Sequence, residues 1–388
     1  MFQRITVQTA GESHGKGVLV TLTGLPAGLA YDAGRVDAAL ARRQLGYGRS
    51  SRQRLEHDQA EVLAGVVAGR LSGAPLVLAV WNQDRSLDDK PPVQRPRPGH
   101  ADLAGGCKYG QTDMRPVLER ASGRETAARV AAGAVAAGLL SELGVQVLGR
   151  VVALGGVEAA PVGPRTTLAG LTKRVRASDL SCHDREALPA MRTAVDRARK
   201  AGDTLGGVIE VCADGVPPGL GSLTGFGTRL DARLGAALLS IQAIKAVELG
   251  DGLAAAAEPG SQVHDPVLSP GPQGPRRGSN RAGGIEGGMS NGQPVLARAW
   301  MKPLSMLRKP LRSWDYGGGT GAGGASEAFF ERSDVTAVPA AAVVGEAMLA
   351  LVLADALLEK TGGDALPEVA RALKAHRRDV ARRFGRRA

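Results

Sequence analysis

The chain is poor in aromatic side chains, in cysteine and in long apolar runs. Phe, Trp and Tyr make up 3% of its 388 residues, which leaves few surfaces on which the bases of a single strand could stack. Cys107, Cys182 and Cys212 are far apart and odd in number, so the sequence supplies neither a disulfide framework nor a zinc site. Such cysteine usage is typical of a reducing compartment.

Secretion and membrane insertion have little support in the sequence. No apolar stretch at the start of the chain is long enough for the core of a signal peptide. The run of small residues over 126–140 contains Arg129 and falls short of a bilayer span. The apolar stretch around 340–359 is interrupted by Glu346 and Asp355. We therefore expect a cytoplasmic protein with no membrane partner.

Positive charge and glycine are abundant instead. The formal net charge is +11, and 54 residues are glycine within a globular composition that is 43% hydrophobic. Much of the excess charge lies in a C-terminal segment, about residues 364–388, where arginines follow a helical pattern. This segment is either a solvated helix face or a nucleic-acid-binding arm, and the scarcity of aromatics favours the first. We expect no nucleic acid partner, and a salt-dependent DNA shift would contradict this expectation.

Strand and helix patterns alternate irregularly, which by itself supports only a mixed α and β protein. A helix capped by Asp32 should run to Arg43. The other expected helices are 124–140, 231–247 and 339–359, and the expected strands are 5–9, 18–25, 62–67, 75–81, 205–213 and 295–301. The Pro- and Gly-rich stretch 257–288 has little periodicity, which indicates a functional lid or a disordered loop. Since no linker interrupts the chain, residues 1–388 should form a single catalytic domain.

The turn between the first two expected strands contains the motif GESHGKG. Its glycines allow a tight turn, and His14 can donate a proton near neutral pH. A loop histidine can equally serve as a structural hydrogen-bond partner. Taken alone, the motif does not decide between these roles.

Arginines are concentrated in the segment RRQLGYGRSSR, which includes Arg43, Arg49 and Arg52. Guanidinium groups match phosphate and carboxylate oxygens bidentately, so closely spaced ones suggest a ligand with more than one anionic group. A solvated basic loop is the alternative.

Two later motifs combine arginine with histidine or serine. In RPRPGHAD the prolines should hold Arg97 and His100 rigidly, and Asp102 could raise the basicity of His100. In ERASGRET, Ser122 is a candidate helix N-cap flanked by two arginines, and helix N-termini bind phosphate through free N–H groups. An ordinary structural loop and an ordinary cap explain these motifs as well.

The remaining motifs are GGIEGGMSNG, MKP at 301–303 and RSD at 332–334. Arginine close to aspartate usually indicates a salt bridge. The residues alone therefore favour a salt bridge for Asp334 over a role as a catalytic base.

Together, and in this order, the motifs resemble chorismate synthase along essentially the whole chain. The segments GESHGKG, RPGHAD, ERASGRETAARVAAGAV, GGIEGGMSNG and RSDVTAVPAAAVVGEAM carry the resemblance. It implies an α+β fold, a β-α-β sandwich of the chorismate synthase type, assembled as a homotetramer. The Pro- and Gly-rich stretch would then be a mobile flap over about 257–281, ordered when ligands bind.

The reaction that the resemblance implies is an anti-1,4-elimination in the last step of the shikimate pathway, which leads to aromatic amino acids. Phosphate leaves 5-enolpyruvylshikimate 3-phosphate and chorismate forms. Reduced FMN is required although there is no net redox change. The family is associated with NADP because NADPH can supply the reducing equivalents, and here NADPH is expected to be at most an indirect source of them. Another FMN-dependent oxidoreductase acting on a phosphorylated anion is the alternative, which net NADPH consumption would identify.

The resemblance also assigns roles to residues. It implies that His14 is the general acid at the departing phosphate, that His100 protonates the reduced flavin, and that Asp334 helps to take the C6 proton by way of flavin N5. The residues implied in substrate binding are Ser13, Arg43, Arg49, Arg52, Arg97, Ser122 and Arg124. Those implied in FMN binding are Arg120, Ala121, Ser122, Gln242, Ala243, Gly287, Lys302, Pro303, Leu304, Ser305, Met306 and Arg332. Met306 departs from the small hydroxyl residue that is common in the family.

Overall fold

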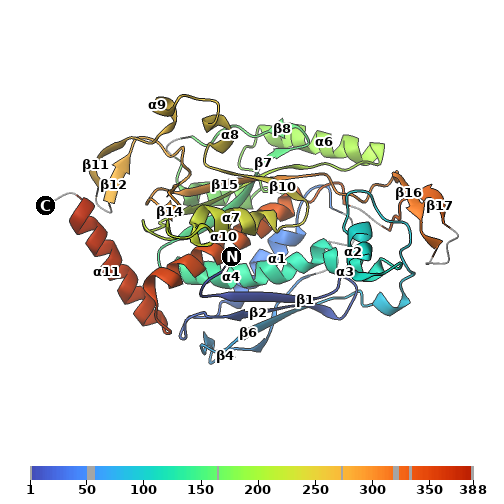
Figure 1. Cartoon of the computed structure of the whole chain (residues 1–388), viewed down its shortest axis with the longest axis horizontal. Helices are drawn as coiled ribbons and strands as arrows, with labels where there is room; N and C mark the ends of the chain where they lie inside the picture. Colours follow the sequence, from blue (N-terminus) through green and yellow to red (C-terminus); the bar gives the residue numbers. More distant parts are fainter. Residues whose placement is uncertain are drawn as a thin grey trace.

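The computed structural model describes residues 2–49, 57–163, 166–271, 274–317, 323–331 and 334–385. Arg52 and Arg332 lie outside these ranges. Two antiparallel sheets enclose a layer of helices, so the predicted β-α-β sandwich is confirmed (Figure 1).

The first sheet has the strand order β1-β2-β6-β3. Its strands are β1 (Thr6–Gly11), β2 (Gly17–Thr23), β6 (Leu76–Trp81) and β3 (Glu61–Ala64). Val18, Val20 and Leu22 alternate along β2 and are almost completely buried, and the helix α4 (Thr126–Glu142) packs on this sheet. β1 and β2 pair with Gly11 opposite Val18, so the GESHG segment is the turn of a hairpin at the edge of this sheet.

The second sheet has the order β10-β15-β9-β7-β8. Its strands are β10 (Ile244–Leu249), β15 (Val295–Met301), β9 (Gly207–Asp214), β7 (Gln146–Leu154) and β8 (Val157–Glu158). Ile209 and Val211 face the helix α10 (Val338–Thr361). On the other face, buried Glu210 pairs with Arg150 at 2.6 Å and with Arg298 at 3.1 Å.

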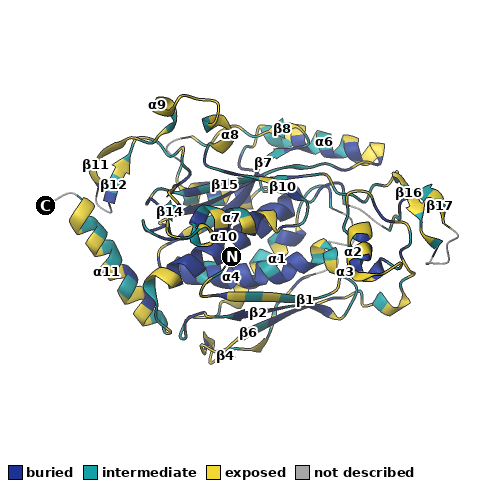
Figure 2. Cartoon of the chain, viewed as in Figure 1, coloured by how far each residue is buried: buried dark blue, intermediate teal, exposed yellow. Residues whose placement is uncertain are grey.

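The helical layer depends on small side chains. α4 and α10 form the main helix pair, flanked by α1 (Ala33–Gln44) and α7 (Leu230–Leu239). A Cβ on Gly133 would lie 2.3 Å from that of Ala347, so only glycine allows this close approach of α4 to α10. In the described chain, α10 alone is long and apolar enough to cross a membrane, and its most apolar stretch is entirely buried (Figure 2).

Asp355, in the C-terminal half of α10, is a completely buried carboxylate. Asp355 accepts hydrogen bonds from the backbone N–H groups of Gln3, Arg4 and Ile5, at 2.7–3.1 Å, and pairs with the guanidinium of Arg233. This arrangement satisfies the buried charge and fixes the start of the chain to its last third.

Shorter elements surround the two sheets. The helices are η2 (Leu87–Asp89), α2 (Asp102–Tyr109), α3 (Arg115–Ala121), η3 (Gly123–Glu125), α5 (Leu168–Arg176), α6 (Ala187–Ala201), η4 (Phe226–Thr228), α8 (Gly252–Ala255), α9 (Gly260–Val263) and α11 (Leu366–Phe384). The two-stranded pairs are β4 (Val66–Val67) with β5 (Arg70–Leu71), β11 (Val267–Gly271) with β12 (Gly274–Arg277), β13 (Ile285–Glu286) with β14 (Met289–Ser290), and β16 (Arg312–Asp315) with β17 (Gly324–Glu327).

Two expectations need correction. The helix expected over 231–247 ends at Leu239, because Ala243 adopts a left-handed conformation (φ 67°) and the following residues pair with β15. The stretch 257–288 is not without secondary structure, since it contains α9, the β11–β12 pair and β13. Figure 1 places β11 and β12 at the end of the molecule opposite α2 and α3.

Candidate functional site

A cavity of about 840 Å³ lies where the N-terminal ends of α4 and α10 meet the hairpin turn of β1 and β2. Its wall also includes the segments before α2, after α3 and after β15, and the turn between α7 and β10. The predicted site residues that line it are Ser13, His14, Arg43, Arg49, Arg97, His100, Ala121, Ser122, Arg124, Gln242, Ala243, Lys302, Leu304, Ser305, Met306 and Asp334. The volume is within the usual range for a small-molecule site.

His14 is held on its Nδ1 side by a buried carboxylate. Nδ1 lies 3.0 and 2.9 Å from the two carboxylate oxygens of Glu119, and the backbone N–H of His14 donates to Oε2 at 2.9 Å. Nε2 lies 3.9 Å from Asp84. Burial alone would raise the pKa of Glu119, but the hydrogen bonds and charges of His14, with a further bond from Arg115, bring it below its ordinary value.

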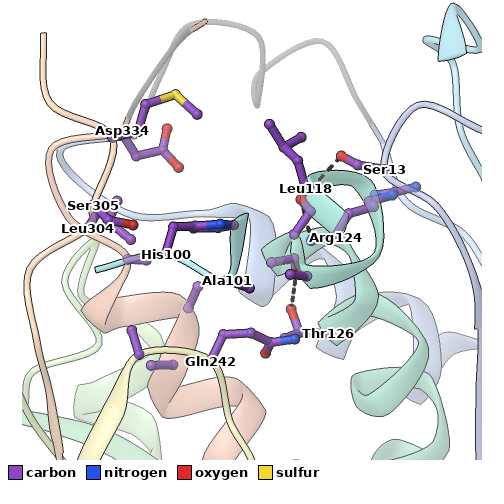
Figure 3. A pocket seen from close by; sticks show the side chains of 18 of the residues that line it. Ser13, His100, Ala101, Leu118, Arg124, Thr126, Gln242, Leu304, Ser305 and Asp334 are labelled. Atoms are coloured by element: carbon purple, nitrogen blue, oxygen red, sulfur yellow. Dashed lines mark hydrogen bonds between the residues drawn. The ribbon is translucent and has the colours of Figure 1, made fainter. Parts of the chain in front are cut away.

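His100 has a similar arrangement. Its Nδ1 lies 2.7 Å from Oδ1 of Asp102, whose side chain is completely buried. Arg97 donates to the same carboxylate from Nε at 2.7 Å and from Nη2 at 2.8 Å. Burial would raise the pKa of Asp102, but Arg97 and His100 lower it well below its usual range. In Figure 3, the His100 ring points into the space between Asp334 and Arg124.

Two predicted anion-binding arginines share one carboxylate. Arg43 donates to Asp58 at 2.6 Å and Arg124 donates to the other oxygen of Asp58, also at 2.6 Å. Arg124 is further fixed by Asn82, whose Oδ1 accepts from Nε at 2.7 Å. Burial lowers the pKa of Arg43, which Asp58 offsets in part. Two guanidinium groups against one carboxylate leave net positive charge at the cavity wall.

Arg49 and Asp334 form an ion pair at 3.1 Å, and both side chains are largely buried. The salt bridge expected for Asp334 therefore exists, with an arginine from a different motif. On the neighbouring wall, Lys302 donates to the carbonyl of Gly99 at 2.9 Å. Burial and the nearby Lys245 lower the pKa of Lys302.

The turn between α7 and β10 places strained backbone at the cavity. Ala243 has a φ of 67°, a conformation that costs a residue with a Cβ roughly 1–3 kcal/mol and that is concentrated at functional sites. Gln242 donates from Nε2 to Glu125 at 3.0 Å, while its buried Oε1 has no hydrogen-bond partner in the described structure.

Of the predicted cofactor residues that the structure describes, three do not line this cavity. Arg120 donates to the backbone carbonyls of Thr9 and Gly11. Gly287 lies in the turn between β13 and β14, and Pro303 lies between two residues that do line the cavity. Their roles, and those of the residues that do line the cavity, remain predictions.

The residues missed by sequence reasoning are the partners that orient the predicted ones. Glu119 lies in the ERASGRET motif, whose serine and arginines are the predicted ligand-binding residues. Its contact with His14, 105 positions away, depends on the fold and has no signal in the sequence. Asp58 and Asn82 had no signal, because neither belongs to a recognisable motif.

The chain resembles known chorismate synthases throughout its length. A family model described as "Chorismate synthase" matches residues 5–358. The chain is 52% identical over 386 residues to the chorismate synthase of Desulforudis audaxviator, with 96% of this chain and 97% of the relative covered. It is 49% identical over 390 residues to that of Thermobifida fusca, with 95% and 97% covered.

A solved structure agrees with these relatives. It is described as "Crystal Structure of Chorismate Synthase", and it matches with a TM-score of 0.80 at 39% identity, covering 98% of this chain and 99% of the other. None of these comparisons supports the alternative of an FMN-dependent oxidoreductase. The extent of the matches and the agreement of the folds show that the chain belongs to the chorismate synthase family.

Proposed function

We propose that the cavity binds 5-enolpyruvylshikimate 3-phosphate beside reduced FMN and that its side chains promote the elimination that yields chorismate, the reaction of a carbon–oxygen lyase. One observation carries this proposal. Two histidines and several arginines, from segments up to 110 positions apart, converge on a single cavity. The substrate has one phosphate and two carboxylates, which suit a wall with several guanidinium groups.

The cavity has features that fit FMN. It is large enough for a flavin and a small substrate together, and Gln242 offers a buried Oε1 that has no hydrogen-bond partner among the described residues. Ala121, Ser122, Ala243 and the segment 302–306 would hold the cofactor. When bound, reduced FMN supplies electron density transiently to the substrate and recovers it.

The side chains of the chain bind, orient and move protons. Arg43, Arg49 and Arg124 would hold the anionic groups of the substrate, with Ser13 and Ser122 as hydrogen-bond donors. His14 would donate a proton from Nε2 to the departing phosphate, since its Nδ1 is already engaged. His100 and Asp334 face the cavity from the side of Ser305. His100 would supply the proton of the reduced cofactor, and Asp334 would help to take the C6 proton of the substrate.

Other properties are proposed on the same basis. We infer that residues 1–388 act as one catalytic domain, because the cavity draws on residues from 13 to 344. The cytoplasmic location is proposed from the sequence, through its scattered cysteines and lack of a signal-peptide core. The chain would act as a homotetramer. Gly287, which does not line the cavity of its own chain, could then contact FMN bound to a second copy. A role of the 257–281 stretch as a flap would also involve a second copy, because β11 and β12 lie at the opposite end from α2 and α3 (Figure 1).

The test is phosphate release from 5-enolpyruvylshikimate 3-phosphate without oxygen, with catalytic FMN reduced by dithionite. We expect chorismate and phosphate in equal amounts and no lasting oxidation of the flavin. Folded protein that binds FMN but forms no product, or that consumes NADPH in proportion to turnover, would contradict the proposal.

A further inference from the structure

Glu119 closes one side of the His14 ring. Its side chain is completely inaccessible to solvent, and its carboxylate accepts from the ring Nδ1 at 2.9 Å and from the His14 backbone N–H at 2.9 Å. The backbone carbonyl of Glu119 also accepts from Ser13 N–H at 3.2 Å. α3 therefore holds both the main chain and the side chain of the β1–β2 turn.

The chemistry of these groups determines which ring nitrogen carries the proton. An ionised carboxylate only accepts hydrogen bonds, so Nδ1 must be the donor. A neutral ring held in this way has its lone pair on Nε2, and an imidazolium ring has its transferable proton there. We propose that Glu119 is a positioning residue for His14, which fixes the tautomer and directs Nε2 toward the cavity. This inference rests on the proposed role of His14 in proton transfer.

Glu119 is itself prevented from turning away. Arg115 lies 3.3 Å from Oε1 of Glu119 and 3.3 Å from Oε2 of Glu331, and Lys90 pairs with Glu331 at 2.7 Å. The Arg115 guanidinium also lies over the ring of Phe329, 5.2 Å from its centroid. A chain of alternating charges thus extends from His14 to the segment just before Asp334.

The second cavity histidine has the same construction. His100, Asp102 and Arg97 repeat the order of ring Nδ1, fully buried carboxylate and arginine that His14, Glu119 and Arg115 show. The sites differ in that Arg97 Nη2 also lies 2.9 Å from Nδ1 of His100. The carboxylates come from different places: Asp102 is two positions from its histidine, and Glu119 is 105 positions away. The same contact between a buried carboxylate and ring Nδ1 is thus built from two unrelated segments, which supports a role for this contact in orienting the histidine rings.

A purely structural role for Glu119, tying α3 to the turn, must be separated from a positioning role. The substitution Glu119→Gln keeps the shape of the side chain and the main-chain bond from Ser13. The Gln amide has one acceptor and one donor where the carboxylate had two acceptors, so a ring with the proton on Nε2 and the lone pair on Nδ1 becomes compatible with the site. Glu210→Gln is the matched control, because Glu210 is also a buried carboxylate between two arginines and is not in the cavity wall.

The experiment measures kcat and KM of Glu119→Gln, His14→Ala and the double variant in the anaerobic assay. We expect Glu119→Gln to lower kcat roughly 100-fold, within the contribution of a general acid, with KM changed less than about 2-fold. In the His14→Ala background, the same substitution should change kcat less than about 2-fold. The Glu210→Gln control should retain kcat within about 2-fold.

A spectroscopic measurement reads the tautomer without turnover. The chain has six histidines, so ¹⁵N-labelled histidine gives a small set of ring signals, and His14→Gln identifies those of His14. In the neutral ring, the protonated nitrogen should be Nδ1 in the unaltered protein, and the form protonated on Nε2 should gain population in Glu119→Gln. If Glu119→Gln does not fold, Glu119→Asp keeps the charge but withdraws the carboxylate, and it should lower kcat while Nδ1 stays protonated.

The outcomes distinguish the two proposals. Full turnover in His14→Ala would remove His14 from the mechanism and with it the proposed proton transfer. A loss in His14→Ala together with full turnover in Glu119→Gln or Glu119→Asp would overturn only the positioning role. An equal loss from Glu119→Gln in both backgrounds would show that Glu119 acts independently of His14.

Discussion

The middle of one helix pair and its N-terminal ends are built on different principles. In their middle, α4 and α10 approach so closely that Gly133 leaves no room for a methyl group beside Ala347. At their N-terminal ends the same helices border a cavity lined by arginines, histidines and carboxylates. Close side-chain packing stabilises the first region, whereas ion pairs position the side chains of the second. Substitutions in the two regions should therefore have separable effects on stability and on turnover.

The largest effect is expected from a histidine at the cavity. His100→Ala should lower kcat roughly 10²–10⁴-fold, because a positioned proton-transfer group contributes about that much. His376→Ala is the control, since this histidine on α11 contacts the carbonyl of Pro218 and is not in the cavity wall. Steady-state kinetics should show no more than about a 2-fold change for the control. Equal losses in both variants would mean that the cavity has no special role.

A cavity arginine should have the next largest effect. Arg124→Gln removes a charge-assisted contact worth roughly 1.5–3 kcal/mol, so KM for the anionic substrate should rise about 10- to 100-fold. Arg382→Gln on α11, whose side chain is 72% exposed, should leave KM within about 2-fold. Similar effects of the two substitutions would indicate general electrostatic attraction in place of a defined contact.

The core is tested with a pair of helical glycines. Gly133→Ala should lower the free energy of unfolding by about 1–3 kcal/mol, as overpacking does. Gly235→Ala on α7 introduces a methyl group with no atom within 4 Å, and it should be neutral or stabilise the helix by up to about 1 kcal/mol. Denaturant unfolding measures both. If Gly133→Ala were harmless, the close helix approach would be flexible and the comparison would fail.

The smallest effect is a dependence of stability on pH that belongs to the cavity. The folded pKa values of Glu119 and Asp102 lie below their ordinary values of 4.5 and 3.8. Their stabilising contribution is thus complete above about pH 4.5 and is lost as the pH falls through the folded values. Unfolding free energies measured from pH 6 to pH 3 should fall less steeply in Glu119→Gln. An unchanged slope would mean that Glu119 does not stabilise the fold through its charge.

The sequence predicts what is local and what recurs in motifs. Strands such as β2 and β15 and the helices α4 and α10 were expected from periodicity, and Asp102 could be linked to His100 because they are two positions apart. The pairing of His14 with Glu119 could not, because it depends on the fold that brings α3 to the turn. The start of β10 falls within the helix expected over 231–247. It forms a strand because its pairing with β15 outweighs local propensity. The fold itself was predicted only through the family resemblance.

The capture of the N-terminal amides by Asp355 has a consequence for biosynthesis. The ribosome synthesises the first strand hundreds of residues before Asp355, which accepts the N-terminal N–H groups and pairs with Arg233. Until Asp355 is synthesised, the N–H groups of Gln3 to Ile5 lack their native acceptor, and β1 is not yet fixed to the rest of the fold. The hairpin that presents His14 is consequently synthesised first but is anchored only after α10 has been synthesised. Chains that stop before α10 should remain targets for chaperones and proteases.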